Sequence, residues 1–201
     1  MDKDYRFLDD LFLAISTIED EYCNWEYQDS LQQTERVFAY ELYYKLKLIS
    51  NIKTSQYAGI KFNGEIGKKI FNDISNLGTV YTIDQKDFNP DLVLHLNQID
   101  SSSENQKLII EIKTKNKSDE DVAKDIIKLN YGIEHLNFQF GVFISVNTNF
   151  ETIIKKLRTI FILENLTQED LINFNSIYIA NYKSRKLDIL TLDKILLLYQ
   201  N

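Results

Sequence analysis

A period of two in the apolar residues predicts two β-strands, residues 90–96 and 107–114. In the first strand three leucines share one face, and Asp91 lies on the opposite face. In the second strand Glu111 and Lys113 are neighbours on one face, opposite a leucine and two isoleucines. The serine-rich segment between the strands is typical of a loop that joins antiparallel partners. The pattern therefore predicts a hairpin that brings Asp91 beside Glu111.

Apolar residues at a spacing of three and four predict helices before and after this hairpin. The predicted helices span residues 4–26, 34–48, 118–130, 150–163 and 167–173. Ser118 precedes the third of them and is followed by acidic residues, which favours a helix start. Two further strands are predicted. Residues 138–146 are mostly apolar, as in a strand buried on both faces, and residues 176–182 alternate between apolar and polar. The apolar tail, residues 187–200, is expected to dock on the rest of the chain.

The composition indicates one domain rather than several. The 201 residues are 44% hydrophobic, with one proline and six glycines, and contain no repeat or low-complexity linker. No apolar run is long enough to span a membrane, and the first residues lack the basic and apolar blocks of a signal peptide. The single cysteine, Cys23, cannot form an intramolecular disulfide and is expected to be a buried or half-buried thiol. These features predict a cytoplasmic location and no membrane partner.

Asp91, Glu111 and Lys113 are the candidate site residues. Two converging carboxylates repel each other unless a cation lies between them, and Mg²⁺ accepts such oxygen ligands. Such an ion can activate a water and neutralise phosphoryl oxygens. Lys113 has two possible roles, either to orient or deprotonate the attacking water or to stabilise charge on phosphorus. A Pro-Asp turn or a Glu-x-Lys strand alone is common scaffolding, but their combination around a loop-sized gap favours a metal-dependent phosphodiesterase.

These residues resemble the signature of the PD-(D/E)xK nuclease superfamily. Pro90-Asp91 matches the first part of that signature and Glu111-Ile112-Lys113 the second. The resemblance covers residues 34–146, and two later segments add to it. Residues 125–129 match an Asp-x-x-Lys-Leu pattern on the following helix, and residues 140–144 match an aromatic-Gly-x-Phe-Ile strand.

The resemblance implies an α/β fold, with a mixed central β-sheet flanked by helices as in restriction endonucleases. The core would comprise residues 31–146 of a single domain, with a helical N-terminal extension, residues 1–30, and an α/β C-terminal extension, residues 147–201. In this fold Asp125 and Lys128 are expected to be packing and helix-surface residues rather than catalytic ones.

The resemblance also implies a deoxyribonuclease with Mg²⁺ or Mn²⁺ as cofactor, because DNA is the more usual substrate of the superfamily than RNA. Asp91 and Glu111 would ligate the metal, and the main-chain carbonyl of Ile112 would be a further ligand. Lys113 would serve the attacking water or the transition state. The implied partner is therefore a nucleic acid.

A further glutamate on the preceding helix often assists the site in this superfamily. Glu35 is assigned that role, because it shares a helical face with three large apolar residues. Glu41 on the same helix is a rival, although it could instead pair with Lys45 one turn away. Glu65, after an Asn-Gly turn near the end of the first strand, is the third possibility.

The net charge of −7 and the pI near 4.9 argue against tight nonspecific binding of nucleic acid. A low-affinity nuclease, or one that a partner protein delivers to its substrate, fits this charge better. The basic residues form three candidate patches: Lys68 and Lys69; Lys113, Lys115 and Lys117; and Lys155, Lys156 and Arg158. Taken alone, each patch is better explained as ordinary solvated surface.

Other residues of the chain leave alternatives to this interpretation. His95 is expected to be a satisfied core or hairpin histidine, and His135 has no partner set for metal or nucleophile chemistry. Some of the twelve tyrosines and twelve phenylalanines could stack on bases or join a homodimer or a protein partner. The two alternative functions are a catalytically silent module that binds proteins and a metal hydrolase of small phosphoesters.

Overall fold

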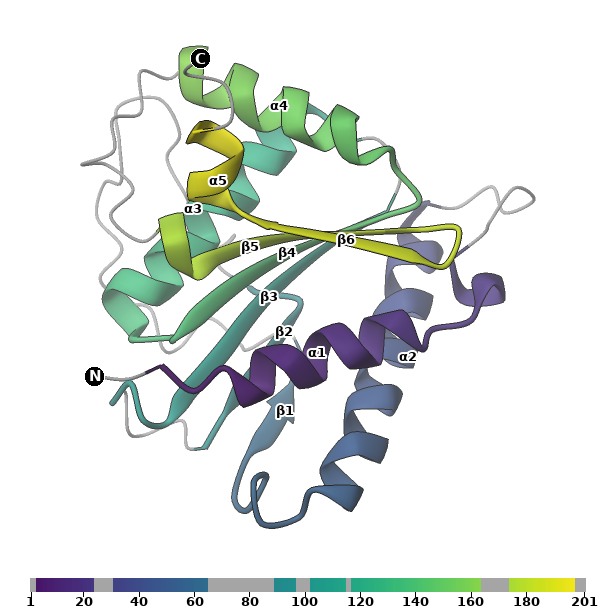
Figure 1. The fold of residues 1–201 in the computed structure, drawn as a ribbon, viewed down its shortest axis with the longest axis vertical. Coiled ribbons are helices and arrows are strands. Elements are labelled where there is room, and N and C mark those ends of the chain that lie inside the picture. The colour runs from purple at the N-terminus through teal and green to yellow at the C-terminus, as the bar shows by residue number, and fades with distance from the viewer. Residues whose placement is uncertain are drawn as a thin grey trace.

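Six β-strands form one mixed sheet in the part of the chain that the structure describes (Figure 1). This computed structural model describes residues 3–23, 31–64, 89–96, 102–114, 117–163 and 174–197. In spatial order the strands are β1 (Lys61–Asn63), β2 (Leu92–His95), β3 (Gln106–Thr114), β4 (Phe140–Val146), β5 (Ile177–Lys183) and β6 (Lys186–Thr191). The neighbours β3–β4 and β4–β5 are parallel, and the other pairs are antiparallel. The α/β fold with a mixed central sheet is therefore confirmed.

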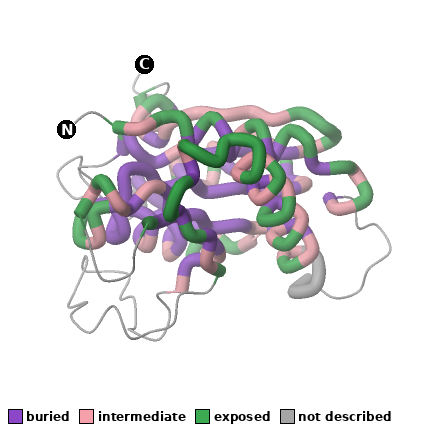
Figure 2. Tube along the Cα trace, turned by 90° about the horizontal axis from the view of Figure 1, so that it is seen from below, coloured by how far each residue is buried: buried purple, intermediate pink, exposed green. Residues whose placement is uncertain are grey.

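Helices cover both faces of this sheet (Figure 1). On one face, α1 (Arg6–Ser16) and α2 (Leu31–Ile52) enclose a hydrophobic core with the strands. On the other face a second core lies beneath α3 (Asp119–Leu136), α4 (Phe150–Leu163) and α5 (Leu192–Leu197). All of β4 is buried, as its apolar sequence predicts, and the buried strands occupy the middle of the molecule in Figure 2. The sheet is thus the central layer of three.

The strands β2 and β3 form the predicted hairpin. They are antiparallel, with Leu92 opposite Ile110, and both of these residues belong to the core beneath α1 and α2. Ile109 belongs to the core beneath α3 and α4. Since alternate residues of a strand share a face, Glu111 and Lys113 point with Ile109 toward α3. The prediction that the two charged residues lie on the face opposite the leucines and isoleucines is confirmed.

The helix α3 packs closely on β3. It starts with a capping box, in which the Ser118 side chain accepts a hydrogen bond from the Asp121 backbone and Asp121 accepts one in return. At Gly132 an added Cβ would lie only 2.5 Å from a side-chain carbon of Ile109, so the helix approaches the strand here. The helix continues six residues past the predicted end and stops where Asn137 adopts a positive φ of 59°. The prediction ends the helix at residue 130, two residues before Gly132, a residue type that is unfavourable inside helices.

The N-terminal helix is shorter than predicted. The prediction covered residues 4–26, whereas α1 ends at Ser16. Both the backbone N–H and the hydroxyl of Thr17 donate to a carbonyl of the last helical turn, which closes the helix. The carbonyl of Ile18 then accepts a hydrogen bond of 2.6 Å from the Tyr182 hydroxyl, and a short 3₁₀ helix follows at Asp20–Tyr22.

The C-terminal part follows the predicted pattern where the structure describes it. The helix α4 has the predicted bounds, and β5 is shifted by one residue toward the C-terminus from the predicted strand. The tail forms β6 and α5, with Leu192 and Ile195 buried, so it is docked as expected. The predicted helix at residues 167–173 lies outside the described residues. Among the described helices, none is both long and apolar enough to cross a membrane.

Candidate functional site

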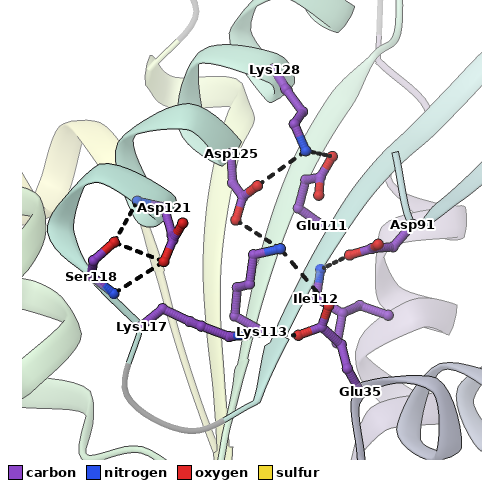
Figure 3. Close-up of polar contacts among 10 residues, drawn as sticks. All are labelled: Glu35, Asp91, Glu111, Ile112, Lys113, Lys117, Ser118, Asp121, Asp125 and Lys128. Carbon is purple, nitrogen blue, oxygen red and sulfur yellow. Dashed lines mark hydrogen bonds and ion pairs between the residues drawn. The ribbon is translucent and has the colours of Figure 1, made fainter. Parts of the chain in front are cut away.

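Asp91 and Glu111 lie on neighbouring chain segments at the start of β2, as the hairpin predicts (Figure 3). The last paired residues are Leu92 and Ile110, so one further step along the antiparallel register sets Asp91 opposite Glu111. The Asp91 carboxylate accepts a hydrogen bond of 2.6 Å from the backbone N–H of Ile112. This bond fixes one carboxylate oxygen of Asp91 against β3.

Glu111 is a buried carboxylate among other charges. Burial, followed by the neighbouring Asp125 and Asp91 carboxylates, raises its pKa well above the ordinary value. The Lys128 ammonium, 3.3 Å from Oε1 of Glu111, and the Lys113 ammonium act in the opposite direction. Two nearby carboxylates and a dry environment therefore make the charged form of Glu111 costly, which is the condition that a bound cation would relieve.

Asp91 is perturbed in the same direction. Burial raises the pKa of Asp91 to about 6, and the charges of Glu35 and Asp125 add to the effect. The Lys113 ammonium and the Ile112 N–H oppose the rise, because both interact favourably with the charged carboxylate. Burial is the larger influence, so this carboxylate takes up a proton in slightly acidic solution.

Lys113 lies between carboxylates of two helices. Its Nζ is 3.3 Å from Oδ2 of Asp125 on α3 and 3.9 Å from Oε1 of Glu35 on α2. Burial lowers the pKa of Lys113, but the carboxylates of Asp125, Asp91 and Glu111 together outweigh it and raise that pKa. Lys113 is therefore an ammonium ion at neutral pH.

Asp125 and Lys128, predicted to be packing and helix-surface residues, both lie in this cluster. Asp125 is buried, and its two carboxylate oxygens lie 3.3 Å from Lys113 and 3.2 Å from Lys128 (Figure 3). Lys128 in turn reaches Glu111, so α3 contributes one charge of each sign to the site. A sequence signal existed, because Asp125 falls within the apolar stripe of α3 between Val122 and Leu129. A charged residue in such a stripe needs a buried partner.

Of the three glutamates proposed to assist, the structure brings Glu35 to the cluster. Its carboxylate oxygens lie 3.9 Å from both Lys113 and Lys117. Glu41 instead pairs with Lys45 at 3.2 Å, the helix-surface alternative. Glu65 lies outside the described residues. The rotation of α2 thus separates two glutamates that the sequence left as rivals.

The remaining candidates lie apart from the cluster. His95 is buried, and its ring is hydrogen bonded to the Asn63 amide at 3.0 Å, as expected of a satisfied hairpin histidine. Cys23 is a buried free thiol, also as predicted. Of the candidate basic patches, Lys117 reaches the cluster, whereas Lys156 is bound to Asp119 at 2.7 Å. Lys68, Lys69 and Lys115 lie outside the described residues.

The site can be tested for its fit to a divalent cation. Within the described part of the chain, no three Asp, Glu, His or Cys side chains form a ready-made ligand group. Mg²⁺, however, is commonly held by one or two carboxylates and keeps several waters. Asp91 and Glu111 are such a pair, and burial and neighbouring carboxylates raise the pKa of both. The donor chemistry therefore fits Mg²⁺ or Mn²⁺.

The fold and this cluster define an α/β protein with a buried charged site at the junction of β2, β3 and α3. No protein-family model, curated protein or solved structure matches the chain. Function is accordingly inferred from the site itself.

Proposed function

We propose that this chain is a metal-dependent nuclease that hydrolyses phosphodiester bonds. The observation that carries the proposal is the convergence of Asp91 and Glu111, both with raised pKa values, beside the ammonium of Lys113. Carboxylates that are costly to keep charged suit the binding of a metal ion. A fixed ammonium beside them suits the binding of a phosphate. The order of these residues also matches the PD-(D/E)xK signature.

Asp91 and Glu111 would hold the cation, with the Ile112 carbonyl as an additional ligand suggested by the resemblance. Bound there, Mg²⁺ or Mn²⁺ would supply a water of lowered pKa and charge neutralisation at the phosphoryl oxygens. The Ile112 N–H keeps the Asp91 carboxylate aligned with β3. The chain itself thus orients one of the two ligands.

Lys113 is assigned to charge stabilisation rather than to proton abstraction. Its raised pKa keeps it protonated at neutral pH, so it would donate to the phosphoryl oxygens on which charge develops. Asp125 holds the Lys113 ammonium at 3.3 Å, and Glu35 approaches it from the opposite side. The proposal thereby decides between the two roles that the sequence leaves open for this lysine.

DNA is the favoured substrate over RNA, and this preference rests on the resemblance alone. The net charge of −7 predicts weak nonspecific affinity, so delivery by a protein partner is consistent with the proposal. A cytoplasmic location would suit either arrangement.

The metal half of the proposal is tested by thermal unfolding. Mn²⁺ or Mg²⁺ in excess over Kd should raise the Tm of the wild type, since a ligand of the folded state stabilises it. Asp91→Asn should abolish that rise, whereas Asp9→Asn on the exposed side of α1 should keep it. An equal rise in all three proteins would contradict the assigned ligands.

The hydrolytic half is tested with labelled single-stranded DNA, duplex DNA and RNA, each with Mn²⁺, Mg²⁺ or EDTA. The nuclease is supported if the wild type shortens one of these polymers in a metal-dependent way and Asp91→Asn does not. Cleavage of a small model phosphodiester alone would instead identify a hydrolase of small phosphoesters. A well-folded protein that binds metal but cleaves nothing would favour the silent protein-binding module.

A further inference from the structure

The solvent-facing side of α2 carries an unusual group of residues. At 3.6 residues per turn, five side chains between residues 36 and 47 fall within an arc of about 100°. We call this group the outer face of α2; it consists of Arg36, Tyr40, Tyr43, Tyr44 and Lys47. Tyr40, Tyr43 and Tyr44 are 71%, 37% and 53% exposed, although large aromatic residues are usually buried. Three exposed tyrosines on two helical turns call for a ligand that contacts aromatic rings.

The outer face contains two cations and no carboxylate. Of the described α2 side chains, residues 35–52, only Glu35 and Glu41 are acidic, and both lie outside this arc. Glu35 is directed toward Lys113, and Glu41 is paired with Lys45. In a chain with a net charge of −7, a face with two cations and no carboxylate is complementary to an anion.

One edge of the outer face is anchored to the sheet. The Lys47 ammonium lies 4.6 Å from the centre of the Phe62 ring on β1 and 5.8 Å from that of Tyr43. Tyr43 also meets Phe62 edge to face at 6.1 Å. These contacts fix the positions of Tyr43 and Lys47. Tyr40 and Tyr44, one helical turn apart and about 6 Å along the axis, remain largely exposed.

We infer that the outer face of α2 binds single-stranded nucleic acid, with bases stacked on Tyr40 and Tyr44 and phosphates near Arg36 and Lys47. Exposed aromatic rings beside cations are the usual means of holding unpaired bases and their backbone. Duplex bases are already stacked on one another and cannot cover these rings. A second copy of the chain is disfavoured, because it would set the cations of one outer face against those of the other.

This inference rests on the proposed function, because it names the substrate class of that site. Arg36 follows Glu35 directly, so the outer face begins at the helical turn that reaches Lys113. Tyr40 lies about 8 Å from Glu35 along the helix axis. A strand held on the outer face would therefore be led past the first turn of α2 to the carboxylate cluster.

Binding is measured separately from cleavage, by fluorescence anisotropy in EDTA. The probe is a labelled oligothymidylate of about 15 nucleotides, within the range of known site sizes, and an equally long duplex is the comparison. The double variant Tyr40→Ser/Tyr44→Ser should bind the single strand at least about 10-fold more weakly than the wild type. Tyr40→Phe/Tyr44→Phe, which keeps both rings, should retain the affinity. The slope of the logarithm of the binding constant against the logarithm of the salt concentration should be less steep by about 0.7 for Arg36→Ala than for the wild type.

The control is Leu13→Ser on α1, which removes an exposed apolar side chain elsewhere. The inference is overturned if the wild type does not bind the single strand, if the duplex binds equally well, or if the serine double variant and Leu13→Ser behave alike. Sedimentation of the same proteins tests a second copy as occupant: self-association lost in the serine double variant, with DNA binding unchanged, would also overturn it. Anisotropy of the wild type in EDTA reports binding whether or not the protein cleaves in Mn²⁺ or Mg²⁺, so failure of the nuclease and failure of this surface are distinguishable.

Discussion

Replacement of Asp91 by Asn should stabilise the protein at neutral and alkaline pH in the absence of metal. The wild-type carboxylate is half-buried beside Glu111, and its pKa is raised from 3.8 to about 6. The asparagine is uncharged at every pH and can still accept the hydrogen bond from Ile112. The variant therefore removes the cost of the charge while it keeps the local bond.

The size of the effect follows from the pKa change. A difference of one pH unit in pKa corresponds to about 1.4 kcal/mol, so Asp91 should cost about 3 kcal/mol when it is fully charged in both folded and unfolded states. Because the folded pKa is raised, the wild type binds more protons than its unfolded form between pH 3.8 and about 6. Its stability is thus retained below that window and is lost as the pH rises through it.

The assay is urea unfolding in EDTA, followed by circular dichroism, at intervals from about pH 4 to pH 8. Asp91→Asn should equal the wild type within about 0.5 kcal/mol at the acidic end and exceed it by about 3 kcal/mol at the alkaline end. Asp9→Asn, on the exposed side of α1, should follow the wild type throughout. A variant that is less stable than the wild type at pH 8, or a difference that does not change with pH, would refute this account of the Asp91 carboxylate.

Three other substitutions test the packing and charge of the fold. Lys128→Met should lower the free energy of unfolding by about 3 kcal/mol at pH 8, because it leaves Glu111 buried without its nearest cation. In urea titrations, adding Glu111→Gln to this variant should recover most of the loss. Asp10→Ala should cost about 3 kcal/mol in the same assay, since this buried carboxylate accepts hydrogen bonds from three side chains. The control Asp9→Ala, at an exposed position, should change the stability by less than about 0.5 kcal/mol. Gly132→Ala should lower Tm by overpacking worth about 1–3 kcal/mol, since its Cβ would lie 2.5 Å from a β3 side chain; an unchanged Tm would show that α3 can move away from the sheet.

The hairpin part of the site was predictable because strand periodicity is a local property. Alternation alone set Glu111 and Lys113 on one face, and the short loop set Asp91 opposite Glu111. The C-terminal end of α3 was harder to predict from the sequence. Gly132 reads as a helix breaker in sequence, yet in the fold it allows close contact with β3.

The helical part of the site depends on contacts between distant residues. Asp125 and Lys128 belong to residue types that are usually exposed, and their burial is understandable only with Glu111 and Lys113 beside them. Likewise, the choice of Glu35 over its rival was set by the rotation of α2 on the sheet, which the helical pattern alone did not determine.

The stability prediction and the proposed function have a common physical origin. The carboxylates of Asp91 and Glu111 destabilise the metal-free fold when charged, and a functional site often retains groups that cost stability. A cation that binds between them should reverse that cost. The gain in stability on metal binding should therefore be larger at pH 8 than at pH 5, where protons compete for the same oxygens.

The most direct test of the nuclease compares Lys113→Ala with Lys124→Ala in metal-dependent cleavage of labelled single-stranded DNA, with protein in excess. Lys124 is a lysine of α3 that pairs with Glu120 on the surface and provides a matched loss of charge. We predict that Lys124→Ala cleaves at the wild-type rate and that Lys113→Ala, folded to the same extent by circular dichroism, is slower by at least about 100-fold. Cleavage by Lys113→Ala at the wild-type rate, or no cleavage by the wild type in Mn²⁺ or Mg²⁺, would contradict the assignment.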